Sequence, residues 1–243
     1  MLADDLRGVG YIALKDLKAY YLKPPNISWG ILLPFAFVLA FAIRNPGDWH
    51  DLLPGLVGLS LLFGTSTMEA TVIVFELRTG ALERLLLAPV RLAALLFGKL
   101  LGGAVFGLVM TSVVLAVGLA AFGAGNVQWP WLVLTLLVSA LTCAALGAFV
   151  SVAVKEIFEA QTLANFFRFP MMFLSGVFVP LAGLPPALQV LARLLPLTYT
   201  IEALQASLYG GPVERIALDL LVLAAFAALL FGLALRTLAQ RLA

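Results

Sequence analysis

The chain has 243 residues, of which 63% are hydrophobic and 12% are charged, and its mean hydropathy is +1.07. A soluble domain carries about 45–50% apolar and about 25% charged residues, so this composition excludes a water-soluble globule and a disordered chain. The 15 Lys and Arg nearly balance the 13 Asp and Glu, which gives no reason to expect a nucleic acid as partner. The sequence predicts an all-α integral membrane protein with one domain over residues 1–243.

Neither cysteine nor histidine chemistry points to a metal site. Cys143 is the single cysteine and lies in an apolar run, while His50 is the single histidine and stands beside Asp48 and Asp51 in a short polar loop. Polar residues in such a loop are usually only solvated, and zinc sites draw on several Cys or His ligands. We therefore expect no metal site and no catalytic residues.

Residues 2–23 are predicted to form an amphipathic helix along the cytoplasmic surface of the membrane. Apolar residues recur at spacings of three and four, and basic residues fall largely on the other side. The apolar positions are Leu2, Leu6, Val9, Ala13, Leu17 and Tyr20. Pro24 and Pro25 end the helix. It is either a membrane anchor alone or an anchor that also contacts a cytoplasmic partner.

Six apolar stretches are long enough to cross the hydrocarbon core, which takes about 20 residues. They lie at 27–43, 52–75, 93–122, 129–154, 163–181 and 216–238. Twelve of the 15 Lys and Arg fall on the side of the membrane that holds both termini, and basic loops stay in the cytoplasm. We expect six transmembrane helices with both termini cytoplasmic.

The link between the second and third spans contains a short predicted helix. Gly80 can serve as its N-cap, and Pro89 ends it after about two turns. An apolar ridge lies on one face and two charges project elsewhere. The ridge consists of Leu82, Leu85 and Leu86, and the charges are Glu83 and Arg84. The pattern suits a helix that seats in a groove of another protein, and it suits an ordinary interfacial loop helix equally well.

Residues 183–209 are too apolar to hang in water and too often broken by proline to span. Leucines recur at helical spacing after a proline pair, and a further proline separates a second helical piece at 200–209. The defining residues are Pro185, Pro186, Leu188, Leu191 and Pro196. Irregular backbone at membrane depth must be buried in protein or line a wet cavity. We predict a segment that dips into the outer leaflet and returns, either as a structural cap or as an exit gate.

Polar and aromatic side chains in the second and fifth spans are candidates for a substrate path. An ionisable group at the bilayer centre costs about 2.5–3.5 kcal/mol, so each one is a functional hypothesis. The candidates are Thr65, Glu69, Asn165, Arg168, Phe169, Phe173 and Ser175. Pairing near the interface, with Lys99 of the third span included, or simple helix packing would also explain them. The glycines spaced by four in that span, Gly98, Gly102, Gly103 and Gly107, are expected to permit close packing.

Two motifs carry a resemblance to a known family. The first is Glu76-x-Arg78-x-Gly80-x-x-Glu83-Arg84-Leu85, with Pro89, Arg91 and Lys99 downstream. The second is Phe173-Leu-Ser-Gly-Val-Phe-Val-Pro180, which leads to Leu184-Pro-Pro and Leu195-Pro-Leu-Thr-Tyr. Together with six spans, these motifs make the whole chain resemble the permease subunits of ABC-2 type transporters, the branch of ABC exporters that handles drugs, polysaccharides and lipids.

The resemblance implies a role for each irregular segment. Residues 80–88 would be the coupling helix that fits a groove of an ATPase subunit, residues 2–21 the interface helix, and residues 183–209 the re-entrant hairpin at the exit. A second permease copy would pair with the first in a bacterial inner membrane, with spans one, two and five facing the conduit. ATP and Mg would be bound by the partner ATPase, because the sequence has no G-x-x-x-x-G-K-[ST] phosphate loop.

The expected function is export of a hydrophobic or amphipathic drug, lipid or glycan-lipid, driven by that separate ATPase. Two alternatives belong to other classes. One is a carrier driven by an ion gradient, with Glu69 and Arg168 as coupling charges, and the other is a membrane scaffold that transports nothing.

Overall fold

The computed structural model of the protein describes residues 2–23, 32, 36, 52–87, 90–123 and 126–242. The predicted first span at 27–43 lies outside the described residues except for Leu32 and Ala36, and so do the His50 loop and Pro89. Within the described ranges all regular structure is helical, as the composition predicts.

The helices that the structure describes follow one another in this order along the chain. They are α1 (Leu2–Asp16), the π-helical turn η1 (Leu17–Tyr21), α3 (Leu52–Arg78), α4 (Ala81–Leu86), α5 (Leu92–Phe122), α6 (Trp129–Ala153), α7 (Ile157–Leu174), the 3-10 turn η2 (Leu181–Gly183), α8 (Pro186–Arg193), α9 (Pro196–Tyr209) and α10 (Val213–Leu242). Four of them, α3, α5, α6 and α10, are long and apolar enough to cross a membrane. These four correspond to the predicted spans two, three, four and six.

The helix α7 differs at both ends from the predicted fifth span at 163–181. It begins at Ile157 because Glu156 and Glu159 form a capping box, in which each side chain accepts a hydrogen bond from the backbone N–H of the other residue. It ends at Leu174, shortly before Gly176 adopts a φ of +87°. Because the added first turns are polar, α7 is not among the four helices that meet the length and composition of a span.

The helices differ in how much of their apolar surface the protein itself covers. Of the most apolar stretch of α3, 78% is buried inside the protein, against 22% for α10. A helix that is apolar all round and buried is a core helix. The apolar surface of α10 stays exposed, as expected for a helix that faces lipid.

Two glycines let α5 pack closely on α3. A methyl group on Gly107 would overlap the side chain of Thr65 and lie 3.0 Å from the Thr65 backbone nitrogen, and one on Gly103 would overlap the carboxylate of Glu69. Small residues allow such close approach between membrane helices, so the expected packing role of the glycines is confirmed at these two positions.

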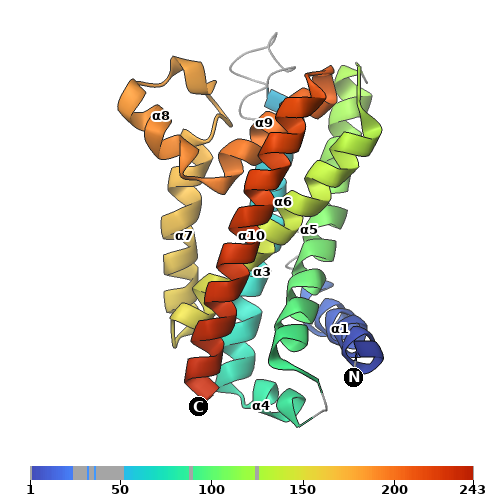
Figure 1. Cartoon of the computed structure of the whole chain (residues 1–243), viewed down its shortest axis with the longest axis vertical. Coiled ribbons are helices and arrows are strands. Elements are labelled where there is room, and N and C mark those ends of the chain that lie inside the picture. Colours follow the sequence, from blue (N-terminus) through green and yellow to red (C-terminus); the bar gives the residue numbers. More distant parts are fainter. Residues whose placement is uncertain are drawn as a thin grey trace.

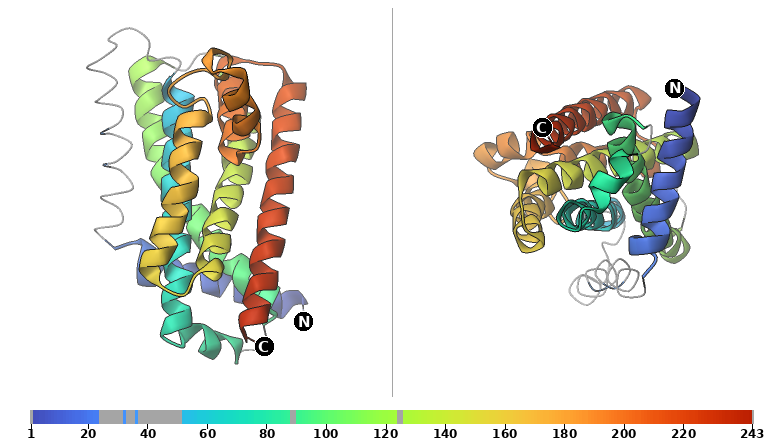
Figure 2. Two further views of the ribbon diagram at one scale, coloured as in Figure 1. Left: turned by 90° about the vertical axis from the view of Figure 1, so that its left-hand side faces the viewer. Right: turned by 90° about the horizontal axis from the view of Figure 1, so that it is seen from below.

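The bundle has two distinct ends. The helix α4, the beginning of α1 and the end of α10 lie at one end, and α8 lies at the opposite end (Figure 1). The helix α1 runs across the long axis of the bundle near the α4 end, while the long helices run along it (Figure 2). This crosswise placement suits a helix that lies along a membrane surface.

Candidate functional site

The helix α1 packs on α5 through a face that the sequence pattern identifies only in part. Val9, Ile12 and Asp16 are buried, whereas Leu6 is 69% exposed and Leu14 is 48% exposed. The expected apolar face is therefore divided between the protein and the outside. Exposed leucines on a crosswise helix are suited to contact with lipid, while the buried aspartate was not expected.

Asp16 belongs to a buried cluster of charges that joins α1, α3 and α5. Lys15 Nζ donates to Glu76 Oε1 at 2.5 Å and lies 2.8 Å from Asp16 Oδ1. Lys99 Nζ lies 3.0 Å from Asp16 Oδ2 and also pairs with Glu76. The side chains of Asp16, Glu76 and Lys99 are fully buried. Two cations and two anions balance, as buried charges require.

Lys15 is the member of this cluster with a partly exposed side chain. Burial alone would lower its pKa, but hydrogen bonds and charges from Asp16 and Glu76 outweigh burial and raise the pKa. Lys15 therefore stays protonated at neutral pH and keeps its positive charge beside Asp16 and Glu76.

Glu69, a substrate-path candidate, is occupied by contacts between helices. Its Oε1 accepts a hydrogen bond from Tyr21 Oη at 2.6 Å and another from the backbone N–H of Gly103 at 3.1 Å. Burial holds the pKa of Tyr21 well above its usual value, so the phenol remains a donor. Glu69 thus links α3 to α5 and to η1.

Arg168 of α7 lies in surroundings of a different kind. Its Nε donates to Ser66 Oγ at 2.9 Å, and one Nη donates to Asn165 Oδ1 at 3.2 Å. The guanidinium carbon lies 5.7 Å from the centre of the Phe63 ring, within the range of a cation–π contact. The residue is 2% exposed, and its second Nη has no hydrogen-bond partner among the described residues.

The structure does not bring the substrate-path candidates together at one place. Thr65 donates to the Leu61 carbonyl of its own helix at 2.7 Å. Phe169 and Phe173 lie on the outer face of α7, 50% and 57% exposed, whereas Ser175 is buried after the helix end. Of the predicted residues, Arg168 and Asn165 meet directly and Glu69 turns to other helices.

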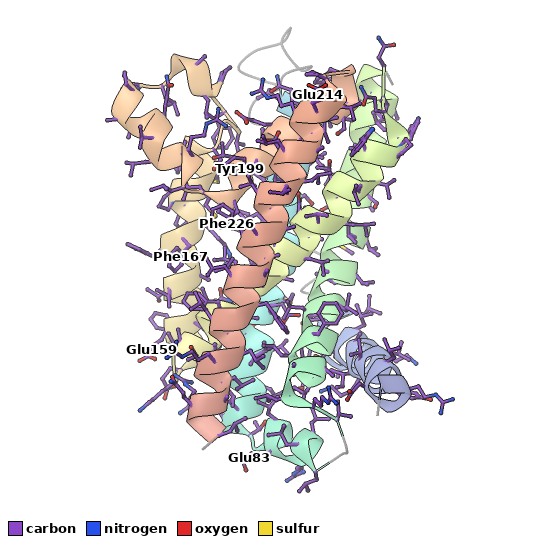
Figure 3. The ribbon with its side chains drawn as sticks, viewed as in Figure 1. Glu83, Glu159, Phe167, Tyr199, Glu214 and Phe226 are labelled. Carbon is purple, nitrogen blue, oxygen red and sulfur yellow. The ribbon has the colours of Figure 1, made fainter. Side chains whose placement is uncertain are left out.

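The short helix α4 is anchored by part of its apolar ridge. Leu82 is fully buried in the core, while Leu85 and Leu86 are half-buried against it. Glu83, Arg84 and Leu87 are exposed, and Glu83 lies at the very end of the molecule (Figure 3). A partner would therefore meet the two charges and Leu87 rather than Leu82.

The turn into α4 depends on a glycine. Gly80 has a φ of +68°, in the left-handed region, which costs glycine little and most other residues considerably more. The predicted N-cap position is therefore correct, although its contribution is a backbone conformation rather than a side-chain cap.

At the other end of the bundle, α8 begins with Pro186 and α9 with Pro196, as expected for prolines in a first turn. Pro185 is the N-cap of α8, Leu188 is half-buried and Leu191 is 50% exposed. The second helical piece starts at Pro196, four residues earlier than predicted, and buried residues such as Leu197 and Ile201 pack it on the bundle.

Two charged residues, Glu202 and Arg215, are among those that line a cavity beside α9. Glu202 accepts a hydrogen bond from Arg193 at 2.7 Å, and its other oxygen lies 3.4 Å from Arg215 of α10. The cavity has a volume of about 450 Å³. Its polar lining comes from Ser175, Glu202, Gln205, Tyr209 and Arg215.

These features define a helical integral membrane protein with one short exposed helix at one end and a proline-initiated helix pair at the other. The sequence profile of the ABC-2 type transporter family matches residues 9–209, most of the chain, and the chain belongs to this family. It is therefore a membrane subunit of an ABC transporter.

Proteins of several bacteria are similar to this chain. The chain is 28% identical over 170 residues to the inner membrane transport permease YadH of Escherichia coli K12. That match covers 68% of this chain and 66% of YadH. It is 28% identical over 210 residues to the probable doxorubicin resistance ABC transporter permease protein DrrC of Mycobacterium tuberculosis H37Rv. That match covers 79% of this chain and 73% of DrrC. It is 35% identical over 133 residues to nodulation protein J of Sinorhizobium fredii. That match covers 52% of this chain and 50% of nodulation protein J. The matches thus span just under two thirds of YadH and half of nodulation protein J.

Proposed function

We propose that this permease forms an exporter with a separate ABC ATPase and a second copy of itself. It moves a hydrophobic or amphipathic molecule, a drug, a lipid or a glycan-lipid, out of the cytoplasm or the inner leaflet. The observation that carries the proposal is α4, whose exposed Glu83, Arg84 and Leu87 stand at the end of the bundle on a helix anchored by buried Leu82. A partner can bind the exposed charges, and because the helix is anchored in the bundle, a movement of the partner would be transmitted to the bundle.

The contacts around α4 suggest which helices would move with it. α4 follows α3 directly, and the Lys15, Asp16, Glu76 and Lys99 cluster ties the last turns of α3 to α1 and α5. A displacement of α4 would therefore carry α3 and α1 together. Closure of the ATPases on ATP would tilt the bundle, and the helix pair α8 and α9 would act as the exit gate at the far end.

The membrane placement follows from the same arrangement. We place the α4 end, with both chain termini, in the cytoplasm and the α8 and α9 end outside, in a bacterial inner membrane, as the name of YadH states for that relative. With α7 and the predicted span at 27–43, which lies outside the described residues, the chain would have six spans, and the α3 and α7 side would face the conduit between two copies.

Transport by inside-out membrane vesicles tests the proposal. With the ATPase present, ATP should drive uptake of fluorescent phosphatidylglycerol, and ionophores should leave the rate unchanged. Vesicles that carry an ATPase-dead partner are the control. Uptake that needs no ATP and collapses with an ionophore would instead establish the ion-driven carrier.

A further inference from the structure

Arg168 is a buried cation without a counter-charge in the described part of the chain. Its hydrogen-bond acceptors, Ser66 Oγ and Asn165 Oδ1, are neutral. Lys99 offers the contrast, since it is equally buried but touches two carboxylates, those of Asp16 and Glu76. The sequence of residues 24–43, which includes the predicted first span, contains no Asp or Glu that could neutralise Arg168.

A guanidinium cannot discharge itself by losing a proton, because arginine stays protonated in proteins. Neutral oxygens satisfy some of its N–H groups, yet a carboxylate or phosphate forms shorter and stronger bonds, often two at once. One Nη of Arg168 has no hydrogen-bond partner within the described residues. The bond to Asn165 is 3.2 Å long and lies within one turn of α7, so the head of the side chain can turn to another acceptor while α7 stays on α3.

The surroundings indicate what kind of anion fits. Ser66 lies near the middle of α3, so the guanidinium is close to mid-depth of a helix that crosses the membrane. On the outer face of α7, Phe166 is 70% exposed, Phe169 50% and Phe173 57%. The side of the bundle that carries α7 in front of α3 is visible in Figure 2. These three rings face away from Arg168, and the ring that contacts the guanidinium is that of Phe63 on α3. A buried cation with an aromatic ring against it matches a molecule that has a negative group and an apolar part.

We propose that Arg168 binds the anionic group of the transported amphiphile, a phosphate, carboxylate or sulfate, while the apolar part packs on the Phe63 ring. This inference rests on the proposed function and narrows its substrate to anionic amphiphiles. The ligand replaces Asn165 as acceptor and uses the second Nη. Cationic amphiphiles of the same size are disfavoured by the same charge.

Binding can be measured on the permease alone, purified in nanodiscs of zwitterionic lipid. Three probes share one tail and differ in headgroup charge: dodecyl phosphate, dodecyl maltoside and dodecyltrimethylammonium. Native mass spectrometry should show dodecyl phosphate bound at least tenfold more tightly than the other two. Arg168→Gln should lose this tenfold preference with less than a twofold change for the other probes, and Arg168→Lys should keep most of it. Arg241→Gln, which removes an exposed arginine at the end of α10, is the matched control and should bind like the wild type.

Equal affinity of the wild type for all three probes, or an unchanged preference in Arg168→Gln, overturns the inference. If Arg168→Gln does not fold, the inference is judged on whether the wild type binds dodecyl phosphate more tightly than the other two probes. The anion could belong to a membrane lipid or to a dissolved molecule, and nanodiscs of phosphatidylglycerol distinguish the two. If the site takes a membrane lipid, phosphatidylglycerol competes with dodecyl phosphate and weakens its binding; if the site takes a dissolved molecule, dodecyl phosphate binds as it does in zwitterionic lipid. Because no ATPase takes part, a negative result here leaves the ATPase-driven export untouched, and a missing ATPase leaves the binding result standing.

Discussion

Single residues in this chain hold buried charge in two ways. Around Lys99, opposite charges from three helices balance one another. Around Arg168, neutral oxygens and an aromatic ring surround a full positive charge. A balanced cluster fixes helices to one another, whereas an unbalanced charge remains available for a ligand. The substitutions that follow from the two arrangements therefore differ in their readout.

Lys99→Met should destabilise the permease strongly. It leaves Asp16 and Glu76 buried with only the partly exposed Lys15 to neutralise them, and breaking a buried ion pair costs about 3–5 kcal/mol. Thermal unfolding of the purified protein in detergent measures the loss. The double variant Lys99→Met with Asp16→Asn removes one anion as well and should recover part of it. A single variant as stable as the wild type would show that the cluster is not a structural tie.

Gly107→Ala should lower the unfolding temperature because its methyl group overlaps the Thr65 side chain and approaches the α3 backbone. The expected cost is about 1–3 kcal/mol. Thr65→Ser removes the overlapping methyl group, so the double variant should regain part of the stability. The prediction fails if Gly107→Ala unfolds at the wild-type temperature.

The sequence predicts a structural feature where that feature produces a local or periodic pattern of residues. Hydropathy identified the long helices, and proline and glycine marked α4, α8 and α9, because these signals are local. The pairing of Asp16 with Lys99 spans 83 positions and follows no period, so a charged residue on the buried face of α1 could not be anticipated. The predicted span at 163–181 follows hydropathy, which does not mark the polar first turns of α7 that begin at the capping box of Glu156 and Glu159.

At the scale of elements, α4 has one side that belongs to the bundle and another that is free. Leu82→Ala should reduce the stability of the permease by about 2–5 kcal/mol, because it removes a fully buried side chain from the core. Leu87→Ser changes a residue that is 87% exposed and should leave the unfolding temperature unchanged while weakening attachment of the ATPase. Unfolding curves and co-purification measure the two effects separately. An ATPase yield unchanged by Leu87→Ser would remove Leu87 from the contact.

At the scale of the whole molecule, the arrangement fixes which parts share a side of the membrane. Thr79 and Asn126 are exposed and follow the ends of α3 and α5. A membrane-impermeant maleimide should label Asn126→Cys on intact cells and Thr79→Cys only after the membrane is opened. The native Cys143 is 4% exposed and should give little background. The reverse labelling pattern would invert the orientation.

The most direct test of the account is to isolate the permease from its native membranes and ask whether an ATPase comes with it. We predict that an ABC ATPase co-purifies and hydrolyses ATP, and that the charge reversal Glu83→Lys with Arg84→Glu releases it. The same reversal at the neighbouring exposed residues Glu214 and Arg215 should leave the ATPase attached, because Glu214 lies at the opposite end of the bundle (Figure 3). A permease that purifies alone and still moves solute under an ion gradient would contradict the account.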